Sequence, residues 1–251
     1  MGERIYRTEA LILRRSDFGE ADRLMLLATP DGKRRVLAKG IRKTTSKLAG
    51  HLELFTRVGL LLAIGRTFDI ITQSDIRDSH GTLRAELPRL SCAYYAAELY
   101  DRFCEENDEH PELYALLAQT FAALDRSANP DLALRWYELR LLHLTGYRPQ
   151  LHRCIVCQEV LTEAAGRFSP TLGGVLCPQH EDADRAAMPM SGAAFRLLRY
   201  LQSQPLTVVE SLRLSPAVRS EAEGLLRAYL RRLLERDLRS VAFLDEILRI
   251  E

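Results

Sequence analysis

The first eighty residues contain short apolar segments that partly alternate with polar residues, a pattern typical of β-strands. Residues with turn chemistry, such as Pro30-Asp31-Gly32, separate these segments. The pattern predicts five strands, over residues 4–15, 23–29, 34–38, 52–63 and 67–72. Five short strands in about 75 residues favour a small closed barrel, and the OB (oligonucleotide-binding) type is the commonest one with a basic, nucleic-acid-facing surface.

Near Thr82 the apolar spacing changes to the alternating steps of three and four that are typical of α-helices. The pattern predicts helices over residues 82–101, from Pro111, from Pro130 to just before Gly146, and over residues 191–201, 216–235 and 241–250. The helix from Pro130 is apolar on more than one side, so we expect it near the centre of its domain. The chain is therefore predicted to be an α+β protein, with an OB-fold barrel of residues 1–80 and an all-α helical domain of residues 81–150 and 185–251.

Two pairs of metal-ligand residues with the same spacing lie between the predicted helices. Cys154-x2-Cys157 is followed after nineteen residues by Cys177-x2-His180. Two such pairs can close a tetrahedron around Zn²⁺, and four protein ligands leave no open position for a reactive water. We therefore expect residues 151–184 to be an inserted zinc-finger-like module with a structural Zn²⁺. The alternatives are that His152 replaces one ligand, or that the thiols are unrelated.

The bulk composition is that of an ordinary globular protein, with 251 residues, 47% of them hydrophobic and 27% charged. No apolar run approaches the roughly 18 residues of a membrane span, and the N-terminus opens with charges where a signal peptide is apolar. We expect a cytoplasmic protein without a membrane partner. Cys92 and Cys104 lie in a helical pattern, where we expect small core residues rather than a disulfide.

Basic residues are concentrated near the N-terminus. Residues 1–80 contain fifteen Lys and Arg against ten Asp and Glu, and between Asp31 and Gly50 there are seven bases and one acid. Such a field favours a polyanion, and each cation would contact phosphate without selecting a base. The predicted DNA-binding residues are Arg14, Arg15, Lys33, Arg34, Arg35, Lys39, Arg42, Lys43 and Lys47. Phe18 and Phe55 are the nearest aromatic residues, and we expect both in the core, which favours an electrostatic groove over a stacking platform.

Enzyme motifs are absent or incomplete. The sequence has neither a nucleotide-binding P-loop nor a G-x-S-x-G elbow, so we expect no catalytic residues and no nucleotide cofactor. His110-Pro111-Glu112 followed by Cys154-x2-Cys157 imitates a zinc deaminase. However, Arg153 stands where the deaminase motif has proline, and Cys177 and His180 would be left without a role.

The last helices carry an arginine series that includes Arg227, Arg231 and Arg232. Glu223 precedes Arg227 by four residues, the favourable order for a helical ion pair. A solvated, salt-bridged face is one interpretation. A basic dock for an acidic partner peptide is the other.

Three separated segments resemble the RecO family of bacterial recombination mediators. They are D-x-G-E-x-D-R-L and A-K-G-x-R-K-x-x-S at residues 17–24 and 38–46, GYRPQLHRCIVC at residues 146–157, and the closing segment at residues 227–248. The family has an N-terminal OB domain, a helical domain and, in many members, a zinc-finger-like insert. Some members have Cys where this chain has His180.

The resemblance implies a nucleoid-associated mediator without enzymatic turnover. RecO-like proteins bind single- and double-stranded DNA, anneal complementary strands, contact the acidic tail of the single-strand-binding protein SSB, and with RecR load RecA onto SSB-coated DNA. By that resemblance, Arg227, Arg231 and Arg232 become candidates for the SSB tail. A zinc-stabilised OB protein for RNA or ribosome assembly is the rival interpretation, and a zinc-dependent deaminase is a remote one.

Overall fold

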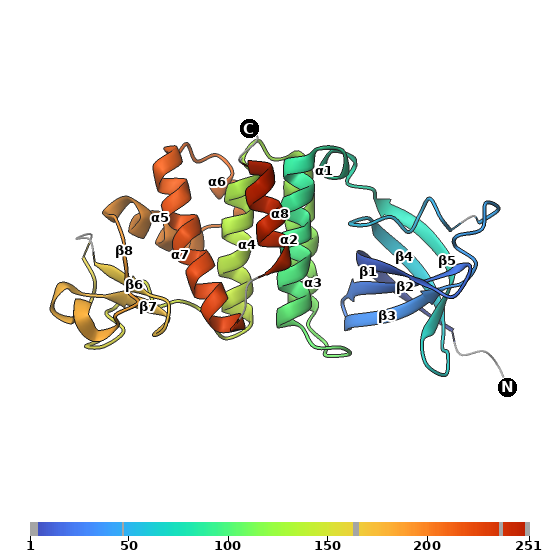
Figure 1. The fold of residues 1–251 in the computed structure, drawn as a ribbon, viewed down its shortest axis with the longest axis horizontal. Coiled ribbons are helices and arrows are strands. Elements are labelled where there is room, and N and C mark those ends of the chain that lie inside the picture. The colour runs from blue at the N-terminus through green and yellow to red at the C-terminus, as the bar shows by residue number, and fades with distance from the viewer. Residues whose placement is uncertain (1–4, 47, 163–165, 236–237, 249–251) are drawn as a thin grey trace. The chain divides into compact units, whose positions relative to one another are not determined.

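The computed structural model describes residues 5–46, 48–162, 166–235 and 238–248 (Figure 1). The chain divides into two compact units, one of Met1–Arg126 with Phe243–Glu251 and the other of Ser127–Ala242. The boundary falls within residues 81–150, which the sequence predicts as part of one helical domain. Among the described residues, no helix combines the length and apolar character that crossing a membrane requires.

The first unit begins with a closed five-stranded barrel, as predicted. Its strands are β1 (Ile5–Phe18), β2 (Asp22–Thr29), β3 (Gly32–Ala38), β4 (Arg57–Ala63) and β5 (Asp69–Asp78). They follow the order β1-β2-β3-β5-β4, and β3 and β5 form the parallel pair that completes the barrel. Alternate residues such as Ile12, Met25 and Val36 point into a buried core, which is why the sequence shows a period of two.

One predicted strand is wrong over part of its length. The strand expected over residues 52–63 begins only at Arg57, because residues 50–55 are mostly turns. Phe55 has a positive φ of 62°, which is incompatible with a strand, and its N–H donates to the Ile12 carbonyl. Its ring is fully buried, as expected.

Three helices complete the described part of the first unit up to Arg126: α1 (Gly81–Ala85), α2 (Leu87–Phe103) and α3 (Pro111–Arg126). The single helix predicted over residues 82–101 is therefore two helices. Glu86 is extended, and Pro88 lies in the first turn of α2. Proline lacks an N–H and its ring excludes the carbonyl four residues earlier, so α1 cannot continue through it.

The second unit is built on α4 (Pro130–Leu144), α5 (Gly192–Ser203), α6 (Leu206–Val209) and α7 (Pro216–Leu234), and α8 (Arg239–Leu248) follows. The side chains of Ser191 and Ser215 cap α5 and α7 by accepting from backbone N–H groups. Asn129 does not cap α4 with its side chain; its amide donates instead to the Glu210 carbonyl. Most of α4 is buried, which confirms its predicted central position.

The predicted module lies between α4 and α5 in the sequence. It holds a small sheet of β6 (Arg167–Ser169), β7 (Gly174–Leu176) and β8 (Met188–Pro189) in the order β7-β6-β8, with a 3₁₀-helix η1 (Pro178–Ala183). Gly173 has a φ of 76° and lies against the Tyr229 hydroxyl, so no larger residue fits there without strain.

Candidate metal centre and nucleic-acid interface

Four side chains of the module meet at one point. Cys154 and Cys157 flank a tight turn in which the Gln158 N–H donates to the Cys154 carbonyl. Cys177 directly follows β7, and His180 lies in η1. Their ligand atoms all lie within 4.8 Å of one another. The Cys157 and Cys177 sulfurs are 3.9 Å apart, and His180 Nδ1 lies 3.1 Å from Cys177 Sγ. The sequence pairs are therefore brought together in one cluster.

The cluster has the chemistry of a metal site. The Cys177 N–H points at Cys154 Sγ at 3.4 Å, as backbone donors do in cysteine knuckles. Burial raises the pKa of the Cys154 thiol, but hydrogen bonds from the backbone of Cys157, Cys177 and Val156 lower it more, to about 6. The lowered pKa favours the thiolate of Cys154, which is the form that binds metal, while burial and the neighbouring Cys154 raise the pKa of Cys177. Three sulfurs and one imidazole nitrogen fit one tetrahedral ion.

The remaining cysteines and the alternative ligand behave differently. His152 is exposed, and the fourth member of the described cluster is His180. Cys92 and Cys104 are buried and are not joined in a disulfide, as predicted. Burial raises the pKa of Cys104 to about 12, so this thiol stays protonated and unreactive.

The basic loop of residues 39–43 lies on the surface of the barrel. The Gly40 N–H donates to Asp22 Oδ1 at 2.7 Å, and the Arg42 N–H donates to the Ala21 carbonyl at 3.0 Å. These bonds hold the loop against the β1–β2 turn. Lys39, Arg42 and Lys43 are exposed, and the Arg42 guanidinium lies 3.4 Å from Asp17. The loop therefore presents cations to solvent from a fixed backbone.

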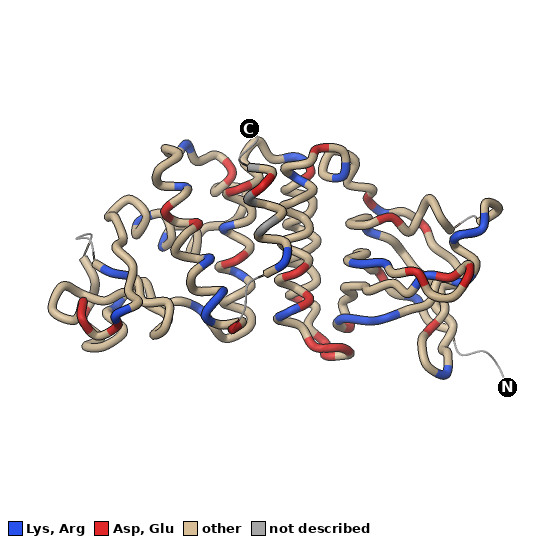
Figure 2. Tube along the Cα trace, viewed as in Figure 1, with Lys and Arg blue, Asp and Glu red and all other residues tan. Residues whose placement is uncertain are grey.

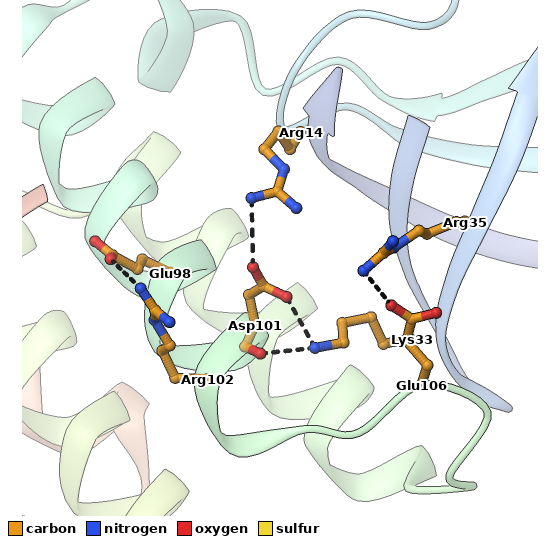
Figure 3. Close-up of polar contacts among 7 residues, drawn as sticks. All are labelled: Arg14, Lys33, Arg35, Glu98, Asp101, Arg102 and Glu106. Atoms are coloured by element: carbon orange, nitrogen blue, oxygen red, sulfur yellow. Dashed lines mark hydrogen bonds and ion pairs between the residues drawn. The ribbon is translucent and has the colours of Figure 1, made fainter. Parts of the chain in front are cut away.

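Three other predicted DNA contacts face acidic residues within the same unit (Figure 3). Lys33 is only 8% exposed, and its ammonium donates to the Asp101 side chain at 2.8 Å and to its carbonyl at 2.7 Å. Arg14 lies 3.7 Å from the same carboxylate, and Arg35 lies 2.6 Å from Glu106. Figure 2 shows the acidic α2–α3 connection that supplies Glu106. A phosphate would have to compete with these carboxylates.

The last predicted DNA contacts are scattered. Arg15 pairs with Glu53 at 2.8 Å, and Arg34 lies over the Tyr6 ring at 5.7 Å. Lys47 lies outside the described residues. Among the described residues, the structure thus separates the other eight predicted cations into an exposed loop and a set engaged by neighbouring side chains.

The members of the arginine series of α7 differ in how exposed they are. Arg227 pairs with Glu223 at 2.7 Å, which confirms the predicted helical ion pair. Arg231 and Arg232 are exposed in the last turn. This end of α7 is therefore the more accessible part of the series.

One surface feature was missed by the sequence reasoning. Phe18 was expected in the core, but it is 46% exposed at the end of β1. Its ring makes an edge contact with Phe68, with centroids 6.2 Å apart. The signal was the neighbouring sequence Asp17-Phe18-Gly19, because a residue next to a turn at the end of a strand has lost the alternation that buries it.

Comparison with known proteins gives concordant matches. The family models described as recombination protein O N terminal and C terminal match residues 1–80 and 84–242. A DNA repair protein RecO of Roseiflexus sp. strain RS-1 is 58% identical over 247 residues, covering 98% of this chain and 87% of the relative. The RecO of Desulforudis audaxviator is 39% identical, with 96% and 97% covered. The RecO of Dehalococcoides mccartyi is 37% identical, with 96% of each covered.

Proposed function

This chain belongs to the RecO family of DNA repair and recombination proteins, and from that premise we propose that it is a mediator that binds DNA without sequence preference and anneals complementary strands. The main support for a DNA-binding surface is the exposed loop with Lys39, Arg42 and Lys43 on an OB barrel. Phosphates along these cations would bring two strands together with less mutual repulsion. Annealing needs no nucleotide and no bond cleavage.

The proposed partners follow from family membership. RecR joins this chain in loading RecA onto SSB-coated single strands, and the acidic SSB tail docks at the exposed end of α7, where Arg231 and Arg232 lie. RecA is contacted indirectly. The charge of the tail and of these arginines is complementary, which supports the placement.

In the same proposal, Cys154, Cys157, Cys177 and His180 hold one structural Zn²⁺. The module has three strands of only two or three residues, so its own apolar core is small. A metal with four protein ligands supplies the missing stabilisation. No catalytic step is assigned to it.

Annealing of SSB-coated complementary oligonucleotides tests the function, with zinc content measured on the same preparation. We expect faster annealing than with SSB alone and about one zinc per chain. A folded, zinc-loaded protein that neither binds nor anneals DNA would overturn the mediator proposal. Stronger binding to RNA than to DNA of the same sequence would favour the rival RNA-binding function.

A further inference from the structure

Phe18 and Phe68 form an aromatic pair on the surface of the barrel. Phe18 ends β1 and is 46% exposed, and Phe68 immediately precedes β5 and is partly exposed. Their rings meet edge to face, with an interplanar angle of 83°. This contact fixes the Phe18 ring and leaves much of it in solvent.

The pair lies beside the basic loop of residues 39–43. Phe18 is opposite Asp22 in the β1–β2 register, and Asp22 accepts the Gly40 N–H that anchors the loop. Asp17 is engaged by Arg23 at 3.0 Å and by Arg42 at 3.4 Å, and Asp69, next to Phe68, accepts from the Tyr6 hydroxyl at 2.6 Å. Asp17 and Asp22 are thus already partnered, while Lys39, Lys43 and the turn residue Glu20 are exposed.

An exposed aromatic ring next to exposed lysines suits one ligand chemistry. Unpaired bases stack on aromatic rings while the phosphates that link them contact cations. Bases inside a duplex are already stacked, so they cannot reach such a ring without first separating. We propose that Phe18, supported by Phe68, is a base-stacking platform that gives this site a preference for single-stranded nucleic acid. This inference rests on the proposed DNA binding. It adds that the site selects strands whose bases are unpaired.

Stacking and phosphate contact differ in their dependence on salt. Losing a phosphate contact flattens the slope of log affinity against log salt, because fewer counterions are released. Losing a stacked base lowers the affinity but does not change the number of counterions released on binding, so the salt slope stays the same. The two kinds of contact can therefore be separated in one titration series.

The test compares an oligo(dT) strand with an abasic strand of the same length, which has the phosphates but not the bases. We expect Phe18→Ala to weaken oligo(dT) binding about tenfold with an unchanged salt slope, and to leave binding of the abasic strand unaltered. Phe68→Ala should give a smaller loss of the same kind. Ile76→Ala is the matched control, because Ile76 is 43% exposed on β5 and is not part of the proposed platform.

Phe18→Trp provides a second readout. The natural chain has one tryptophan, Trp136, which is buried in the second unit. The new indole should retain oligo(dT) affinity, and its fluorescence should be quenched by oligo(dT) but not by the abasic strand.

The outcomes separate the two proposals. If the unchanged protein binds neither strand, DNA binding fails and the platform fails with it. If it binds both strands equally and Phe18→Ala changes neither, the DNA function stands and the platform is wrong. A loss that is equal on both strands also overturns the platform, because it would place the effect on the phosphate contacts or the fold.

Discussion

The Lys33 ammonium lies 2.8 Å from the Asp101 carboxylate, which joins strand β3 to helix α2 within the first unit (Figure 3). Around this pair, the Asn107 N–H donates to the Lys33 carbonyl at 3.0 Å. Gly32 packs so closely on the Asp108 backbone that a Cβ would lie 2.1 Å from its carbonyl oxygen. The edge of β3 is therefore occupied by the α2–α3 connection. Lys33 is placed to stabilise this contact, and the exposed loop at residues 39–43 is better placed for DNA.

We expect Lys33→Ala to lower the free energy of unfolding by on the order of 2 kcal/mol, because Asp101 loses its buried partner and keeps only the more distant Arg14 at 3.7 Å. Urea unfolding measures this change. Lys39→Ala is the control, since an exposed lysine should contribute less than about 0.5 kcal/mol. If Lys33→Ala unfolds at the same urea concentration as the natural chain and loses DNA affinity as Lys43→Ala does, then Lys33 is a DNA contact.

Changing Arg42 and Lys43 together to Ala should weaken binding to every DNA sequence and flatten the salt slope by about two units, one for each lost phosphate contact. Fluorescence anisotropy at four or five salt concentrations gives the slope. Arg185→Ala with Arg213→Ala removes the same charge from exposed positions of the second unit. An equal loss with that pair would mean that net charge, and not this loop, determines affinity.

The metal cluster could be predicted from the sequence because each ligand pair spans only a few residues, so local turns bring the members of a pair together. Lys33 could not be placed in the same way, because its partner Asp101 is 68 residues away and only the folded barrel brings them together. In the sequence analysis, charge was the only criterion that placed Lys33 and Lys43 on the same DNA-binding surface. Phe18 was assigned to the core on residue type, but its position at the end of β1 leaves it exposed. The break between α1 and α2 could have been predicted from the sequence, because Pro88 excludes a continuous helix.

Cys157→Ser should reduce the bound zinc well below one per chain and destabilise the module, because three remaining ligands cannot close the shell. Metal analysis and thermal unfolding on the same sample measure both effects. Cys104→Ala is the control, because Cys104 lies in the first unit outside the cluster and this variant should keep about one zinc. Full zinc content in Cys157→Ser would mean that another residue completes the site.

Reversing the charge of Arg231 and Arg232 to Glu should abolish binding of an acidic SSB-tail peptide, because both residues are exposed at the end of α7 and would then repel it. Isothermal titration with the peptide measures the change, and DNA binding by the barrel should be unaffected. The matched control is Arg185→Glu with Arg213→Glu, which changes net charge equally at other exposed positions of the second unit. Peptide binding that survives charge reversal at Arg231 and Arg232 would mean that the tail binds elsewhere. An equal loss of peptide binding in both variants would mean that the overall charge of the protein causes the effect. A loss confined to Arg231 and Arg232 would show that a local basic dock, and not the general field of the protein, holds the partner.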